Sequence, residues 1–278
     1  MKRSPVIPGW LVMLLLISMV AHAGRIFAAC PKSLKGGTSW FDSSTLVTYD
    51  GNIGHVLAVR LTLTFNNDSL SGKYFYVKTL RDIRVKGAVL GDRSFTLEEY
   101  DKNGLVVARF KGTFPEEDPK ASYGEGNKLQ CEVMIGVWEQ ISPKRSFPFY
   151  LKLNYAISGT LDDRYASAMA KPNNDEASIE RLAQRFLTAV HTNDRKQVAA
   201  VVHYPFSAYR PGKGPYVIKN RKEFLANYDE IISEQYKEDL KRAIPKHMFM
   251  DKHNFIMLGE RGFPWIGSDS KIWLFGAN

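Results

Sequence analysis

The chain divides into two stretches that differ in how their hydrophobic residues are spaced. Between residues 45 and 157, apolar and polar residues alternate in eight short runs separated by turn residues, and no helical spacing interrupts them. In one run, Val59, Leu61 and Leu63 share one face of a strand, which is typical of a half-buried antiparallel strand. This pattern predicts an all-β antiparallel domain over residues 45–158, folded as an up-and-down barrel or, failing that, as a sandwich.

The stretch 72–114 forms the centre of this predicted domain, with hairpin turns expected at 90–93 and 101–104. Glycines lie inside three of the strand runs, at positions 87, 112 and 136. A glycine inside a strand marks a sharp bend or a close approach of two backbones. Their recurrence favours the bends of a small barrel over a flat sheet.

After residue 175 the spacing changes to that of helices. Ile179, Leu182 and Phe186 recur at steps of three and four residues, which gives a helix one apolar face. Further helices and then short strands follow, so the sequence predicts an α+β domain over 176–278. The apolar pattern fades over 159–175, which we interpret as the linker between the two domains.

The first domain carries a series of recognisable motifs: Gly-Lys-Tyr-Phe-Tyr at 72–76, Leu-Glu-Glu-Tyr-Asp-Lys-Asn-Gly at 97–104, Phe-Lys-Gly-Thr-Phe at 110–114 and Gly-Val-Trp at 136–138. With these motifs it resembles small lipocalin-like barrels of uncharacterised bacterial envelope proteins, over about residues 50–155. Strand-and-turn motifs specify an architecture rather than an activity. The resemblance therefore implies at most a binding role.

Four aromatic residues of the predicted barrel are candidates for binding a ligand: Tyr74, Tyr76, Tyr100 and Trp138. They are expected either to line a ligand cup or to form cross-strand aromatic pairs that stabilise the sheet.

Basic residues surround one predicted turn of the barrel. Arg81 and Arg84 belong to this strip, together with Lys78 and Lys86. The strip is expected either to receive an acidic partner or to be a solvated hairpin whose charges oppose aggregation.

The second domain resembles the cone-shaped domain of the nuclear transport factor two-like superfamily. The resemblance covers 176–278 and rests on element order and on short motifs, which are Phe-Leu-Thr-Ala-Val at 186–190, His-Tyr-Pro at 203–205, Glu-Phe-Leu-Ala-Asn-Tyr-Asp at 223–229, Met-Leu-Gly at 257–259 and Trp-Ile at 265–266.

That superfamily includes isomerases, dehydratases and hydrolases as well as plain binding modules. Enzymes of this shape need an acid, a base or a tyrosine facing the cavity, and the resemblance makes His203, Tyr204, Tyr228 and Asp229 the catalytic candidates. His203 and Tyr204 are adjacent in an extended segment, so only one of them can face the cavity. The alternative is a structural role, with Tyr204 and Tyr228 as core aromatic residues and the histidines as surface or hydrogen-bonded groups.

The first residues of the chain predict export. A basic start, an apolar run too short to span a bilayer and a small-residue site ending at Ala23 are typical of a secretory signal peptide over 1–23. The chain is therefore expected to be periplasmic or secreted, with an N-terminal segment at 24–44. A competing cut lies before Cys30, where Phe-Ala-Ala-Cys loosely resembles a bacterial lipoprotein box and would give a lipid anchor.

The two cysteines of the chain are Cys30 and Cys131. In an oxidising compartment they are expected to form a disulfide, which closes a loop of about 100 residues and is worth roughly 4–5 kcal/mol in the chain-entropy model. Lipidation of Cys30 would instead leave Cys131 unpaired. Two cysteines alone cannot form a structural zinc site.

The net charge of the chain indicates which classes of binding partner to expect. The chain carries 38 basic and 29 acidic residues, a formal charge of +9, and removal of Lys2 and Arg3 with the signal peptide leaves 36 against 29, or +7. Export argues against nucleic acid and favours an anionic envelope surface or an acidic protein, and the alternative is that the positive charge only aids solubility. The sequence lacks a nucleophile elbow, a phosphate loop, a dinucleotide fingerprint and a paired-histidine zinc helix, so neither a cofactor nor a metal is expected.

Together these patterns predict an exported, non-catalytic binding protein, of the inhibitor, immunity or envelope accessory type, that engages another protein. One alternative is a cone-domain enzyme of the isomerase or hydrolase type that uses His203 or Tyr204 with Asp229. Another is a carrier that holds a small ligand inside the barrel.

Overall fold

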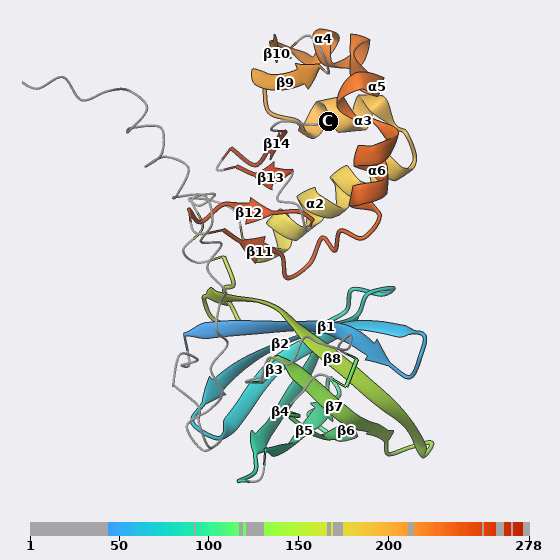
Figure 1. Cartoon of the computed structure of the whole chain (residues 1–278), viewed down its shortest axis with the longest axis vertical. Helices are drawn as coiled ribbons and strands as arrows, with labels where there is room; N and C mark the ends of the chain where they lie inside the picture. Colours follow the sequence, from blue (N-terminus) through green and yellow to red (C-terminus); the bar gives the residue numbers. More distant parts are fainter. Residues whose placement is uncertain are drawn as a thin grey trace, which may run out of the picture.

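The computed structural model shows a β-barrel followed by helices and short strands, which we name the C-terminal region. In Figure 1 the C-terminal region lies above the barrel, next to β1. The structure describes residues 44–274 except for 92, 117–118, 121–130, 166–167, 169–174, 211–213, 252, 260–263 and 268.

The barrel confirms the all-β antiparallel prediction. Each strand pairs with the next along the chain, and β1 pairs with β8 to close the barrel. Its strands are β1 (Thr45–Ile53), β2 (Leu57–Asn66), β3 (Ser69–Tyr76), β4 (Ile83–Val89), β5 (Ser94–Tyr100), β6 (Val106–Thr113), β7 (Val133–Gln140) and β8 (Arg145–Ser158).

Large aromatic side chains occupy the barrel interior. The ring of Phe110 lies 5.4 Å from that of Tyr74 and 5.3 Å from that of Phe149, in edge-to-face contacts. Such contacts add to the free energy gained by burying the rings. The buried aromatic residues of this cluster are Tyr49, Phe65, Tyr74, Phe95, Phe110, Phe114, Trp138 and Phe149.

Two of the strand glycines are required by the close approach of β6 and β7. Gly112 and Gly136 face each other across this pair. A Cβ atom on Gly136 would lie 2.1 Å from the Lys111 carbonyl oxygen, and one on Gly112 would lie 2.8 Å from the rings of Phe95 and Phe149. Neither position therefore has room for a side chain, whereas the sequence predicts bends of the barrel at these glycines.

The C-terminal region begins with helices and ends with a four-stranded antiparallel sheet, β11 to β14, while β9 and β10 form a separate hairpin. Four helices start after a residue whose side chain accepts a backbone N–H, as expected for N-caps. Its elements are α2 (Glu176–His191), α3 (Arg195–Val201), β9 (Phe206–Arg210), β10 (Gly214–Ile218), α4 (Arg221–Ala226), α5 (Tyr228–Ile231), α6 (Glu234–Leu240), β11 (Phe249–Met250), β12 (Ile256–Met257), β13 (Trp265–Ile266) and β14 (Ile272–Trp273).

The outer face of β1, β2 and β3 is covered by the C-terminal region, and we name this contact the junction. Thr48, Thr62 and Phe75 point away from the barrel interior and are nevertheless fully buried. Part of the predicted linker also packs here, because Tyr165 is fully buried and its hydroxyl accepts the N–H of Met248 at 2.8 Å.

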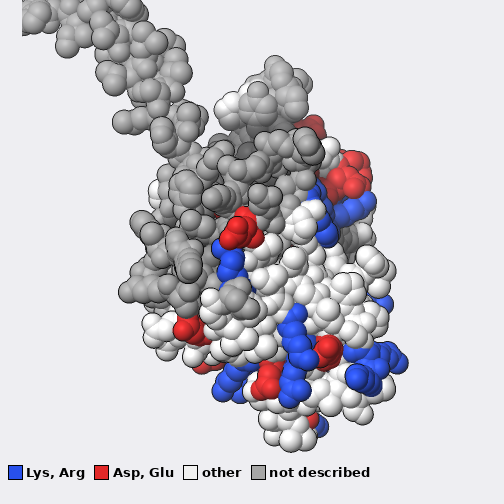
Figure 2. Space-filling model, turned by 60° about the horizontal axis from the view of Figure 1, so that its bottom comes forward, with Lys and Arg blue, Asp and Glu red and all other residues white. Residues whose placement is uncertain are grey.

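The wall of the barrel away from the junction carries charges of both signs. Glu98 on β5 pairs with Arg109 on β6 at 3.1 Å, and Lys111 on β6 pairs with Glu139 on β7 at 2.7 Å. Figure 2 shows acidic and basic side chains close together on this face, with uncharged surface between them. Positive and negative charges therefore alternate on this wall, which carries no patch of one charge sign among its described residues.

Several predictions about the N-terminal part lie outside the described residues, including the signal peptide, the segment at 24–43 and Cys30. Cys131 is fully buried in the barrel core, and the described residues include no free cysteine. The Cys30–Cys131 disulfide, the lipid anchor and the domain boundaries stay predictions. Among the helices of the described residues, none has the length and apolarity needed to cross a membrane.

Candidate functional site

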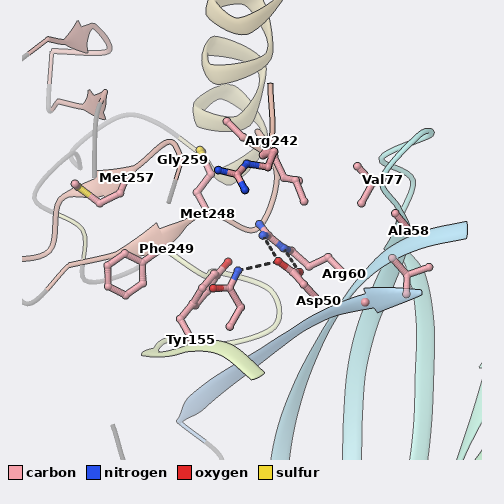
Figure 3. Close-up of a pocket in the computed structure, with 15 residues that line it drawn as sticks. Asp50, Ala58, Arg60, Val77, Tyr155, Arg242, Met248, Phe249, Met257 and Gly259 are labelled. Carbon is pink, nitrogen blue, oxygen red and sulfur yellow. Dashed lines mark hydrogen bonds and ion pairs between the residues drawn. The ribbon is translucent and has the colours of Figure 1, made fainter. Parts of the chain in front are cut away.

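The candidate site is a cleft of about 400 Å³ at the junction (Figure 3). The barrel supplies one wall, including Ala58 on β2 and Val77 just after β3. The segment before and within the four-stranded sheet supplies the other wall, including Phe249 and Met257. Ligand sites of proteins have this size and often lie between structural units.

The floor of the cleft is an ion pair between neighbouring strands. Arg60 on β2 lies opposite Asp50 on β1 and donates two hydrogen bonds to its carboxylate, at 2.7 and 2.6 Å. Asn154 on β8 donates a third to the same carboxylate at 2.7 Å. The charge of Asp50 is therefore already compensated by the protein.

Arg60 also ties the barrel to the C-terminal region. Its side chain is buried and donates to the backbone carbonyls of Lys246 and His247, each at 3.2 Å. The Tyr155 hydroxyl donates to the same His247 carbonyl. With its two bonds to Asp50, Arg60 thus uses four of the five N–H donors of its guanidinium, in line with the need of a buried arginine for partners. The bonds to Lys246 and His247 hold the chain that leads into β11.

His247 is enclosed at the bottom of the junction. Its Nδ1 lies 3.2 Å from the Thr62 hydroxyl, its Nε2 lies 3.4 Å from Asp82, and the Phe75 ring meets it edge-on. Burial, together with the positive charge of Arg164, lowers the pKa of His247 to about 3. The imidazole is therefore neutral at neutral pH.

The same region contains a group with metal-ligand potential, formed by Glu176, Glu180 and His247, whose ligand atoms lie within 4.8 Å of one another. Protein groups already use these atoms. Glu180 accepts from the His247 N–H at 2.9 Å and from Lys246 Nζ at 3.2 Å, and Glu176 accepts from the Arg164 N–H at 3.1 Å. With two cationic side chains beside it, the group is better suited to fastening α2 to the barrel than to holding a metal.

The open side of the cleft differs from its floor. Ile244, Met248, Phe249 and Met257 line it with apolar surface. Arg242 projects toward the same space (Figure 3), and it forms no ion pair or hydrogen bond with the residues that the structure describes. The cleft therefore combines an apolar wall with one uncompensated positive charge.

Three of the predicted aromatic binding residues converge inside the barrel. The Tyr74 hydroxyl donates to Glu99 at 2.7 Å and Trp138 Nε1 donates to the same carboxylate at 3.2 Å, while the Tyr76 ring packs edge-on against Tyr74. Burial and the Glu99 charge raise the pKa of the Tyr74 hydroxyl. Their polar atoms are thus used within the barrel, as part of its packing.

The other predicted binding residues lie on the outside of the barrel. Tyr100 donates to Glu98 at 3.0 Å and sits opposite the exposed Arg84 on β4. Arg81 is exposed in the turn between β3 and β4. These residues therefore share no pocket with Tyr74, Tyr76 and Trp138.

Among the catalytic candidates, His203 has an acidic partner that the sequence did not indicate. Its Nδ1 lies 2.5 Å from Asp269, and its ring stacks on Trp273 with the centroids 3.8 Å apart. Trp273 Nε1 donates to Asp269 at 3.0 Å and thereby orients the carboxylate. A shallow hollow of about 410 Å³ adjoins the pair and includes Arg221 and Lys271.

The remaining catalytic candidates are engaged elsewhere. Asp229 forms a two-point ion pair with Arg195 at 2.8 and 2.9 Å, and the Tyr204 hydroxyl donates to the Ala199 carbonyl at 3.1 Å. Tyr228 is buried beneath Arg195. The structure thus brings neither His203 nor Tyr204 next to Asp229.

Comparisons with protein-family models, with curated proteins and with solved structures find no match for this chain.

Proposed function

We propose that the protein is an exported binding protein that holds a small amphipathic anion in the junction cleft. The observation that supports this most directly is the lining of the cleft, where four apolar side chains face a space that also receives Arg242. An apolar pocket with a few well-placed polar groups is the usual form of a small-molecule site. Because Asp50 is already paired with Arg60 and Asn154, the cleft favours a ligand of negative charge.

We also propose that the chain folds as two domains, as the sequence predicts. Two separate clusters of buried apolar residues support it, one inside the barrel and one centred on the C-terminal helices. A cone-like form of the second domain also remains part of the proposal, and it would make the cleft a site between two binding folds.

Calorimetry with decanoate tests the proposal, because this ion has an apolar chain and one carboxylate. We expect binding to the wild type and affinity about tenfold weaker in Arg242→Ala, since a lost charge-assisted hydrogen bond is worth roughly 1.5 kcal/mol or more. Decyltrimethylammonium, which carries the opposite charge, should not bind.

A pair of tryptophan variants locates the ligand. Ala58 is exposed and lines the cleft, so Ala58→Trp should occupy the space and abolish decanoate binding. Val217→Trp changes an equally exposed position on β10 and should leave binding unchanged. Decanoate that binds Ala58→Trp as tightly as the wild type would refute the cleft as its site.

A second candidate function, hydrolysis or isomerisation, rests on the His203–Asp269 pair. Asp269 accepts from Nδ1, which leaves Nε2 as the nitrogen able to take a proton from water or substrate at the adjoining hollow. Hydrolysis of p-nitrophenyl acetate that is lost in His203→Ala but kept in the exposed control His253→Ala would support this function. Equal rates in both variants would reject it.

A further inference from the structure

One end of the barrel gathers four turns, which we name the hairpin rim. The antiparallel order places the β1–β2, β3–β4, β5–β6 and β7–β8 turns at the same end, at residues 54–56, 77–82, 101–105 and 141–144, and the rim also includes the adjoining first residues of β2 and β8, at 57 and 145–147. Figure 1 draws the β1–β2 and β7–β8 turns on the right-hand side of the barrel. These turns can therefore touch one flat surface at the same time.

Exposed apolar side chains concentrate on the hairpin rim. Val56 is 84% exposed and Leu105 is 64% exposed, each at the tip of a different turn. Five of the eight large apolar side chains that are exposed in the described part of the chain belong to the rim, and they are Val56, Leu57, Leu105, Ile141 and Phe147. Turn residues are usually polar, so apolar side chains gathered at one end of the barrel suit contact with an apolar medium.

The hairpin rim also carries several basic side chains. The exposed basic side chains of the rim form no ion pair with the described residues, and they are Lys78, Arg81, Lys102, Lys144 and Arg145. The two acidic residues are already engaged, Asp82 by Lys246 at 3.1 Å and Asp101 by the N–H groups of its own turn. Lys and Arg side chains also stand at the right-hand edge of Figure 2, the side of the β7–β8 turn in Figure 1.

We propose that the hairpin rim docks on an anionic lipid surface. Apolar tips on separate turns can each enter the interfacial layer, and the surrounding cations then meet lipid phosphates, with each contributing an electrostatic attraction. Polar turn residues separate the apolar tips, which suits the insertion of each tip between lipid headgroups. The unpaired cations make an anionic surface the complementary partner.

The junction cleft lies beside the hairpin rim. Ala58 and Val77 line the cleft, and their chain neighbours Leu57 and Lys78 belong to the rim. A docked rim therefore brings the cleft close to a source of amphipathic anions. Membrane docking does not depend on the proposed ligand, because it is measured without one and decanoate binding is measured without vesicles.

Co-sedimentation of the mature chain with vesicles tests this inference. We expect binding to vesicles of phosphatidylcholine mixed equally with phosphatidylglycerol, and little binding to phosphatidylcholine alone. The double variant Lys144→Glu/Arg145→Glu should partition about tenfold more weakly or worse. Lys219→Glu/Lys222→Glu reverses two exposed charges near α4, away from the rim, and should bind as the wild type does.

A second pair of variants tests the apolar tips. Val56→Ser/Leu105→Ser should weaken binding to the mixed vesicles at physiological salt, whereas Leu90→Ser/Val217→Ser, two exposed positions off the rim, should not. Equal binding by both pairs, or equal binding to neutral and anionic vesicles, would overturn the proposal. Capture on an acidic protein such as poly-glutamate without vesicle binding would show that the rim serves a protein partner instead.

Discussion

The interior of the barrel and the junction are built from opposite chemistry. Inside the barrel, eight aromatic rings pack against one another, and Glu99 is held by Tyr74 and Trp138. At the junction, charged and polar side chains are bonded to one another around an open cleft. This contrast supports our proposal that ligand recognition takes place beside the barrel rather than within it.

The barrel interior and the junction differ because they lie on opposite faces of the same strands. The inward residues of β1 to β3 are apolar and close the core, while the outward Arg60 and Thr62 would normally face water. The C-terminal region buries these outward residues, so each must find hydrogen-bond partners there. The partners it supplies fix two structural units against each other and leave the cleft between them.

The largest expected effect comes from opening the barrel interior. Phe110→Ala should cost about 3–5 kcal/mol of unfolding free energy, because Phe110 is buried and contacts both Tyr74 and Phe149. Urea unfolding measures the loss. Decanoate affinity should stay unchanged in the folded variant, and a loss of decanoate binding would show that the barrel, not the cleft, holds the ligand.

Removing the Arg60 ion pair at the junction should lower the unfolding free energy somewhat less than Phe110→Ala does. Arg60→Ala should lower the unfolding free energy by about 3 kcal/mol, at the low end for removing one partner of a buried pair, because Asp50 is one-third exposed. The matched control is Arg195→Ala, which removes an exposed two-point pair with Asp229 and should cost less than about 1 kcal/mol. Equal losses in the two variants would mean that the junction is no more than surface contact.

Acid should weaken the junction through His247. The folded state keeps this histidine neutral down to about pH 3, whereas the unfolded state takes up the proton below its ordinary pKa of 6.5. Stability is therefore complete above pH 6.5 and is lost as the pH falls below it, by about 2 kcal/mol at about pH 5. His247→Gln should remove this part of the acid slope in urea titrations, and the exposed control His253→Gln should keep it.

The smallest effect on stability is expected at the mouth of the cleft. Arg242 is exposed and unpaired within the described residues, so Arg242→Ala should change the unfolding free energy by no more than about 0.5 kcal/mol. Its affinity for decanoate should nevertheless fall. A stability loss as large as that of Arg60→Ala would mean that Arg242 belongs to the structural network.

The sequence predicted the barrel because strand periodicity is local. Alternation placed Val59, Leu61 and Leu63 on one face of a strand, and all three lie in the barrel core. The junction could not be predicted in this way. Arg60 lies on the outer face, as its position in the run indicates, but its burial depends on residues 246–247, far along the chain.

In the C-terminal region, too, contacts between distant segments could not be predicted from the sequence. The sequence motif identified His203 but associated it with Asp229, whereas Asp269 in the tail is its neighbour in space. No fixed spacing relates these positions. A polar run before Trp273 was the only signal in the sequence, and the parallel bridge between Val202 and Ile272 is what brings the two segments together.

The most direct test of whether the ligand binds at the junction or inside the barrel is a crystal structure of the protein with decanoate. We expect density for the ion at the junction, with its carboxylate at Arg242 and its chain against Met248 and Phe249, and an unchanged barrel interior. Density for the chain among the rings around Tyr74 and Phe110, with the cleft unchanged, would contradict this expectation.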